Sequence, residues 1–103
     1  MNIKSQDTAI TFSDTLRVDG TPVDLTGATV LFLMTTTERG SLFSAAATVV
    51  SAAEGTVNYQ PGGGFPTLPG AYLQEWEVTF TNGRRLTFPS AGYNQITIVA
   101  DLN

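Results

Sequence analysis

The sequence contains no cysteine and no histidine, and these two absences exclude several kinds of site at once. A disulfide scaffold, a thiol redox centre and a zinc finger all require these side chains. Ser–His and Cys–His nucleophile pairs are excluded for the same reason, which leaves only carboxylates and the single lysine, Lys4, as general bases. We therefore predict that the chain has no catalytic residues, binds no metal or cofactor, and is not an enzyme.

Charge is scarce too, since only 14% of the residues are charged and Lys+Arg 5 against Asp+Glu 9 gives a net charge of −4. A nucleic-acid binder needs a basic surface, so we expect no nucleic-acid partner. The densest apolar run, residues 28–34, is far shorter than the roughly 18 residues of a membrane span, and the polar N-terminus lacks the apolar segment of a signal peptide. We expect a protein made in the cytoplasm, without membrane contact.

The hydrophobic content of 42% is too high for a disordered chain, and the length of 103 residues suits one domain, residues 1–103. Residues 1–8 are the candidates for a flexible N-terminal arm. Apolar residues recur with a period of two along the chain, between turn motifs spaced eight to twelve residues apart. We expect strands over residues 10–13, 16–18, 28–37, 41–51, 56–59, 71–81, 84–88 and 93–100.

This pattern, without a convincing helix, predicts an all-β fold: an immunoglobulin-like antiparallel β-sandwich of seven to eight strands. Asp19-Gly20-Thr21-Pro22 predicts a turn, because Asp-Gly supplies positive φ and proline presets the φ of its own position. Asn82-Gly83 predicts a two-residue type I′ hairpin, with positive φ at both positions.

Two groups of acidic residues could in principle carry chemistry. Glu75 and Glu77 share one face of a strand, roughly 7 Å apart, a distance compatible with glycoside hydrolysis. We favour a solvent-facing role, with an ion pair to an arginine beyond the 82–83 turn. Asp14, Asp19 and Asp24 fall in adjoining predicted turns, but their spacing matches no calcium loop.

The glycine-rich segment 62–64 is followed by Phe65-Pro66, so no helix can begin there and a phosphate-binding loop is excluded. We interpret Phe65 and Leu68 as exposed apolar tips that contact a partner. The alternative for Phe65 is that its side chain folds back onto the edge of the sandwich. Tyr72, Trp76 and Phe80 form an aromatic stripe, which we interpret as core; the alternative is a carbohydrate-binding face.

The weakly charged, Thr-, Ala- and Gly-rich composition suggests a surface that packs against neighbouring proteins. Leu31, Leu33 and Val99 point away from the inward sets of their strands and are, with Phe65 and Leu68, our candidate partner contacts.

Several segments resemble one known family when they are taken together. They are Asp14-Thr15-Leu16, residues 19–30 (DGTPVDLTGATV) with Phe32 and Met34, residues 55–59 (GTVNY), residues 69–72 (PGAY), residues 75–80 (EWEVTF), Asn82-Gly83 and residues 87–89 (TFP). The chain resembles the phage baseplate upper protein N-terminal domain family over nearly its whole length. The resemblance implies an immunoglobulin-like, non-enzymatic anchor domain in a tailed-phage virion.

Since the sequence stops at Asn103, directly after the last predicted strand, we expect an adaptor without a receptor-binding part. The resulting hypothesis is a structural virion protein, present in multiple copies, that docks on other virion proteins as a tail or baseplate adaptor. The alternatives are a capsid decoration (cement) protein bound to the major capsid protein and a carbohydrate-binding module.

Overall fold

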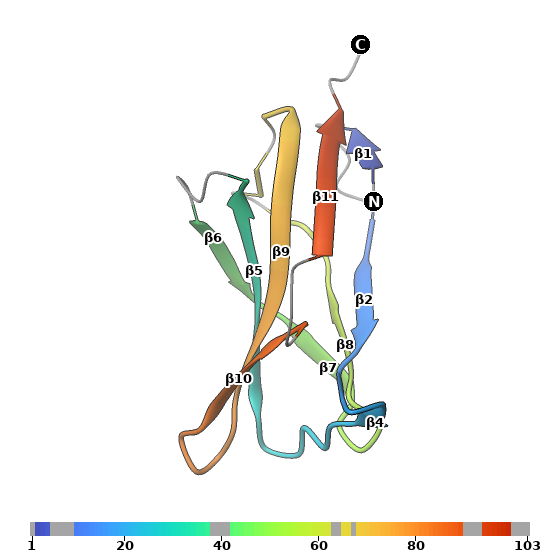
Figure 1. Ribbon diagram of the computed structural model, residues 1–103, viewed down its shortest axis with the longest axis vertical. Helices are drawn as coiled ribbons and strands as arrows, with labels where there is room; N and C mark the ends of the chain where they lie inside the picture. Colours follow the sequence, from blue (N-terminus) through green and yellow to red (C-terminus); the bar gives the residue numbers. More distant parts are fainter. Residues whose placement is uncertain are drawn as a thin grey trace.

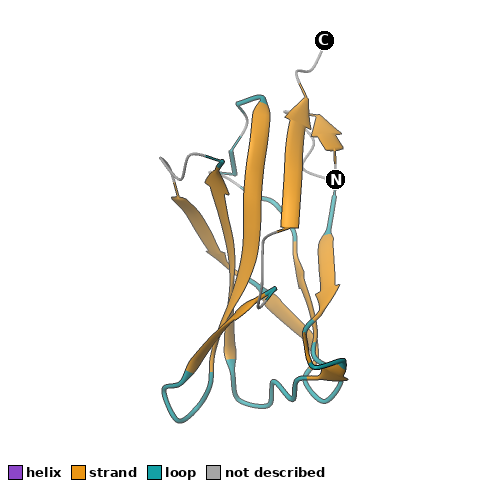
Figure 2. Cartoon of the chain, in the orientation of Figure 1, coloured by secondary structure: helices purple, strands orange, loops and turns teal. Residues whose placement is uncertain are grey.

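The computed structural model describes residues 2–4, 10–37, 42–62, 65–66, 68–89 and 94–99, and it contains only strands, turns and loops there (Figure 1, Figure 2). The strands form two packed sheets and a short two-stranded ribbon. They are β1 (Asn2–Lys4), β2 (Phe12–Thr15), β3 (Arg17–Val18), β4 (Thr21–Pro22), β5 (Thr29–Thr36), β6 (Leu42–Ala46), β7 (Thr48–Ser51), β8 (Thr56–Tyr59), β9 (Gly70–Thr79), β10 (Arg85–Phe88) and β11 (Asn94–Val99).

The larger sheet has the strand order β1-β11-β9-β5-β6, and β10 also pairs with β9. The long strand β9 runs antiparallel to β5 on one side. On its other side it pairs first with β11, over residues 70–74, and then with β10, over residues 76–79. β1 lies parallel to β11 at the outer edge of the sheet, while the other pairs are antiparallel. Both edges of β9 are therefore covered along almost its whole length (Figure 1).

The smaller sheet has the order β2-β8-β7 and covers one face of the larger sheet. The chain passes directly from the larger to the smaller sheet at Ala47, whose N–H donates to the carbonyl of Val30 at 2.9 Å. The strand predicted over residues 41–51 is thus two strands, β6 and β7, in different sheets. The alternation of side chains continues through Ala47, so the pattern alone gave no sign of this switch.

The core lies between the two sheets and is built mainly from inward residues predicted from the alternation, together with Leu25 and Phe65 from loops. Phe80, which was predicted as part of the core stripe, is only partly buried and packs against it. Val30, Phe32 and Met34 of β5 are at most 2% exposed, and Trp76 and Val78 of β9 are at most 1% exposed. All the buried apolar side chains form one cluster. It comprises Phe12, Leu16, Leu25, Val30, Phe32, Met34, Val57, Tyr59, Phe65, Tyr72, Trp76, Val78, Phe88, Ile96 and Ile98. The predicted all-β antiparallel sandwich is confirmed.

The turn predicted over residues 19–22 is confirmed at Asp19-Gly20: both residues have positive φ, 51° and 81°, and they join β3 to β4 as a two-residue hairpin. Thr21 and Pro22 do not belong to the turn, because they form strand β4. Gly55 is also in the left-handed region, with φ 69°. A Cβ atom at this position would lie 2.8 Å from the carbonyl oxygens of Leu16 and Val23. The backbone packs against this glycine so closely that no other residue fits without a shift of the main chain.

The hairpin at Asn82-Gly83 forms as predicted, but its turn type was wrong. Gly83 has φ 84°, whereas Asn82 is not in the positive-φ region. The N–H of Gly83 donates to Phe80 O at 2.9 Å, and the N–H of Phe80 donates to Arg84 O at 2.8 Å. The loop therefore has three residues, as in a type I turn followed by a left-handed glycine. The Asn82 side chain accepts a hydrogen bond from the N–H of Arg84, which stabilises this longer loop.

Two other expectations differ from the structure. Eleven strands are described instead of seven to eight, because the predicted strand over 41–51 is divided and because β1 (Asn2–Lys4) and β4 (Thr21–Pro22) lie where no strand was expected. Residues 2–4 of the expected N-terminal arm pair with β11, so this part is a strand of the larger sheet. The rest of the expected arm lies outside the described residues, which resume at Ile10.

Candidate docking surface

The outer face of the larger sheet, defined here as the side facing away from the smaller sheet, carries most of the predicted contact residues. Directly opposite residues of antiparallel strands share a face, so the strand register places these side chains in rows. Three rows cross from β6 over β5 to β9 and its next neighbour. They are Leu42–Thr35–Leu73–Gln95, Ser44–Leu33–Glu75 and Ala46–Leu31–Glu77–Thr87.

Leu31 and Leu33 lie at the centre of this outer face and are half-buried by their neighbours on the same face. Val99 is at the end of β11 and is 43% exposed, and Leu42, at the start of β6, is 70% exposed. The prediction that Leu31, Leu33 and Val99 point away from the core is therefore confirmed. Leu42 was not singled out from the sequence, although its position at the start of an alternating strand was evident.

Few charges lie on the outer face. Among the described residues of these rows, Glu75 and Glu77 are the acidic ones, and Arg85 on β10 is next to them. Arg85 Nη1 lies 4.0 Å from Glu77 Oε1, which confirms the predicted ion pair between this strand and the returning one. An exposed pair of this kind contributes little to stability, of the order of 0–1 kcal/mol. The rest of the face presents Thr, Ser, Ala and Leu, which can be covered without stripping water from charges.

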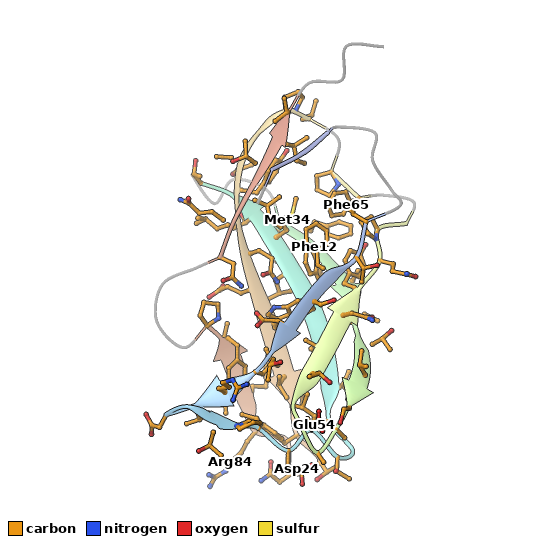
Figure 3. The ribbon with its side chains drawn as sticks, turned by 90° about the vertical axis from the view of Figure 1, so that its right-hand side faces the viewer. Phe12, Asp24, Met34, Glu54, Phe65 and Arg84 are labelled. Carbon is orange, nitrogen blue, oxygen red and sulfur yellow. The ribbon has the colours of Figure 1, made fainter. Side chains whose placement is uncertain are left out.

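The predicted contact loop is only half correct. Leu68 is 75% exposed, and its backbone carbonyl accepts a hydrogen bond from the Tyr72 hydroxyl at 2.8 Å. Phe65 is only 7% exposed and is not a surface tip. Its ring centroid lies 5.7 Å from that of Phe43 and 5.9 Å from that of Phe12, and Figure 3 shows it turned inward beside Phe12.

Phe65 therefore closes one end of the core, as in the alternative in which it folds back onto the sandwich. The physical reason is that the rings of Phe12, Phe43 and Tyr59 line this end of the sandwich and contact Phe65. An apolar side chain gains more free energy there than in water. Phe65 is therefore not available as a partner contact, whereas Leu68 remains a candidate.

A group of polar side chains lies between the sheets and was missed by the sequence analysis. Trp76 Nε1 donates to Asp14 Oδ2 at 3.1 Å, which joins β9 to β2. Gln74, 4% exposed, accepts a hydrogen bond from Asn94 Nδ2 at 2.9 Å. Asp14 was expected in a turn, but it lies in β2 and faces inward, opposite Val57. Its alternation with Phe12 and Leu16 could have revealed this position.

The same side chains line a cleft of about 490 Å³ between β2 and the β9–β11 pair. Gln74 Nε2 also donates to the carbonyl of Glu75, so the amide is held on both sides. The polar groups that line the cleft are thus engaged with one another, which is typical of a structural network. The carbohydrate alternative depended on the stripe of Tyr72, Trp76 and Phe80. Trp76 is 1% exposed and Tyr72 is 7% exposed, so neither ring is free to stack against a sugar.

The acidic residues do not assemble into a metal site in the described part of the chain. Asp19 and Asp24 lie in separate turns, away from Asp14 in β2. Thr26 donates to Asp24 Oδ1 with both its hydroxyl, at 2.6 Å, and its N–H, at 3.0 Å. These hydrogen bonds lower the pKa of Asp24 below its ordinary value. Asp24 therefore acts as a turn-forming residue.

Nor does the described part of the chain include any helix long and apolar enough to cross a membrane. A scan against protein-family models found no match, and a search of curated proteins found none either.

Proposed function

We propose that this chain is a non-enzymatic structural protein of a tailed-phage virion, and that it serves as an adaptor at the tail or baseplate. The family is suggested by the sequence motifs described above. The observation that carries the docking role is the outer face of the larger sheet, with Leu31 and Leu33 at its centre. Docking covers these leucines further and gains hydrophobic free energy. Because Glu77 and Glu75 lie directly opposite the two leucines, the partner has to offer hydrogen bonds or positive charge to these carboxylates.

The location is tested by labelling phage particles, purified from infected cells that produce the chain, with an antibody against the chain. Label confined to the tail end supports the adaptor role. Label over the head overturns it in favour of the capsid decoration alternative. If the chain is abundant in infected cells but absent from purified particles, the virion proposal as a whole is wrong.

The docking face is tested with Leu33→Lys, which places a charge at the centre of the outer face. Val50→Lys is the matched control, because Val50 is 60% exposed on the smaller sheet, away from this face. We expect Leu33→Lys to reduce the amount of chain in particles at least tenfold, a loss of about 1.4 kcal/mol or more in docking free energy. The control should be incorporated normally. Circular dichroism and Trp76 fluorescence verify that both variants fold. Normal incorporation of folded Leu33→Lys would exclude this face.

A further inference from the structure

Strand β6 (Leu42–Ala46) is an open edge of the larger sheet. β5 pairs with it on one side, and no described strand pairs with it on the other (Figure 1). Natural edge strands are usually protected from pairing by charged residues, by proline or by a covering segment. The continuous stretch formed by β6, Ala47 and β7, residues 42–51 (LFSAAATVVS), has no charged residue and no proline.

The direction of the free backbone groups of β6 follows from its register with β5. Ala47 lies opposite Val30, and its N–H donates to the Val30 carbonyl. Hydrogen-bonded and non-hydrogen-bonded pairs alternate along an antiparallel ladder. The backbone groups of Leu42, Ser44 and Ala46 therefore point away from β5, where an added strand would find both donors and acceptors.

The side chains of β6 are complementary to a second copy of the same strand. If two copies run antiparallel with Ser44 on the two-fold axis, Leu42 lies opposite Ala46 of the other copy. On the inner face Phe43 likewise lies opposite Ala45. In each pair a large side chain meets a small one, so the two strands can approach without a clash or a void.

This register also brings the outward-pointing backbone groups of the two strands together, since it pairs Leu42, Ser44 and Ala46 only with one another. No like charges face each other, because the strand has none. We propose that two copies of this chain associate through β6, with antiparallel pairing centred on Ser44, so that their larger sheets join into one continuous sheet. The contact is isologous and closes after two copies. This inference is independent of the virion role.

The first test is disulfide cross-linking, for which the chain is suited because it has no cysteine of its own. Residues opposite one another in a hydrogen-bonded antiparallel pair have Cα atoms about 5.5 Å apart, within the range that a disulfide spans. Under mild oxidation, Ser44→Cys should form covalent dimers about tenfold more than Thr29→Cys. Thr29 is exposed on the same outer face but belongs to β5, which is an interior strand.

The register is tested with Leu42→Cys and Ala46→Cys. A mixture of the two variants should cross-link. Each alone should not, because like residues would then be roughly 13 Å apart along the strand. Cross-linking of Leu42→Cys alone, to the same extent as in the mixture, would overturn the register.

The second test is sedimentation of the unmodified chain. A contact of this size is weak, so we expect the mass to rise from 10.9 kDa towards twice that value between about 10 µM and 1 mM. Ser44→Lys and Ser44→Glu, which each bring like charges together on the axis, should be monomeric. An equimolar mixture of the two should dimerise again. Thr29→Lys adds the same charge to the face and should dimerise normally.

Three results would refute the proposal. The unmodified chain could remain monomeric at about 1 mM, a concentration at which even small specific interfaces are populated. Folded Ser44→Lys could dimerise as well as the unmodified chain. The lysine and glutamate variants could also fail to associate when mixed, which would indicate that the two copies of residue 44 do not meet on the proposed axis.

Discussion

The clearest test of the fold concerns Phe65 and Leu68, two apolar residues of one loop that the structure assigns opposite roles. Phe65→Ala removes a ring that is 7% exposed and contacts the rings of Phe12, Phe43 and Tyr59. Leu68→Ala removes a side chain that is 75% exposed. The two substitutions therefore separate the contribution of the loop to the core from any contribution to a contact surface.

The magnitude follows from burial and ring contacts. Burying a phenylalanine side chain contributes about 1.5–3 kcal/mol, and each favourable ring pair adds roughly 0.5–1.5 kcal/mol. Phe65 lies in a loop that can partly collapse after truncation, so we expect a loss near the lower end of the usual range for Phe→Ala, about 3 kcal/mol. For a domain of this size the melting temperature should fall by roughly 12–15 °C. Leu68→Ala should change the stability by less than about 0.5 kcal/mol.

The assay is urea unfolding followed by the fluorescence of Trp76, the only tryptophan, which is buried in the same core. Far-UV circular dichroism provides a second probe of the same transition. If Phe65→Ala costs less than about 1 kcal/mol, or no more than Leu68→Ala, the loop does not close the core and the packing argument is wrong. The inverse result, a large loss for Leu68→Ala alone, would refute it equally.

Three further predictions follow from the turns and from the polar groups between the sheets. Gly55→Ala should lower the free energy of unfolding by about 2–4 kcal/mol, measured by urea titration, because the added Cβ meets two carbonyl oxygens; an unchanged midpoint would contradict the close approach. Asp14→Ala should cost about 1–3 kcal/mol, because it leaves the buried Trp76 Nε1 without an acceptor, while Asp14→Asn, which keeps an acceptor oxygen, should cost less. Since hydrogen bonds from Thr26 lower the pKa of folded Asp24, its contribution is present above the unfolded pKa and is lost as the pH falls through the folded one. Asp24→Asn should therefore reduce the loss of stability between about pH 5 and pH 2, and an identical pH profile for both proteins would refute this assignment.

The core strands could be predicted from the sequence because alternation alone decides which side chains are buried. β5 and β9 alternate without interruption, so Phe32 and Trp76 were placed correctly in the core. The turn at Asp19-Gly20 was predictable for a different reason. Its backbone conformation depends on the two residues themselves and not on distant neighbours.

The partners of each strand could not be predicted in the same way. Residues 42–51 alternate without a break, yet the chain changes sheet at Ala47, because pairing depends on which strands lie nearby. The position of Phe65 depended on the aromatic rings at the end of the sandwich, whose arrangement no local pattern encodes. Asp14 and Gln74 were different, because their inward positions followed from the alternation. They were overlooked because polar residues are not expected to be in a core, and both are held there by hydrogen bonds.

The two proposed contacts of this protein involve different parts of the larger sheet: one is its outer face and the other is its edge strand, β6. Docking on the outer face covers Leu31 and Leu33 from above, whereas pairing through β6 extends the sheet in its own plane. A dimer would present two outer faces side by side, and a partner with repeated sites would bind both of them with an effective local concentration far above that of a free subunit. Ser44→Lys should then weaken docking although Leu31 and Leu33 remain unchanged. Docking that is unaffected in this monomeric variant would mean that each face acts alone.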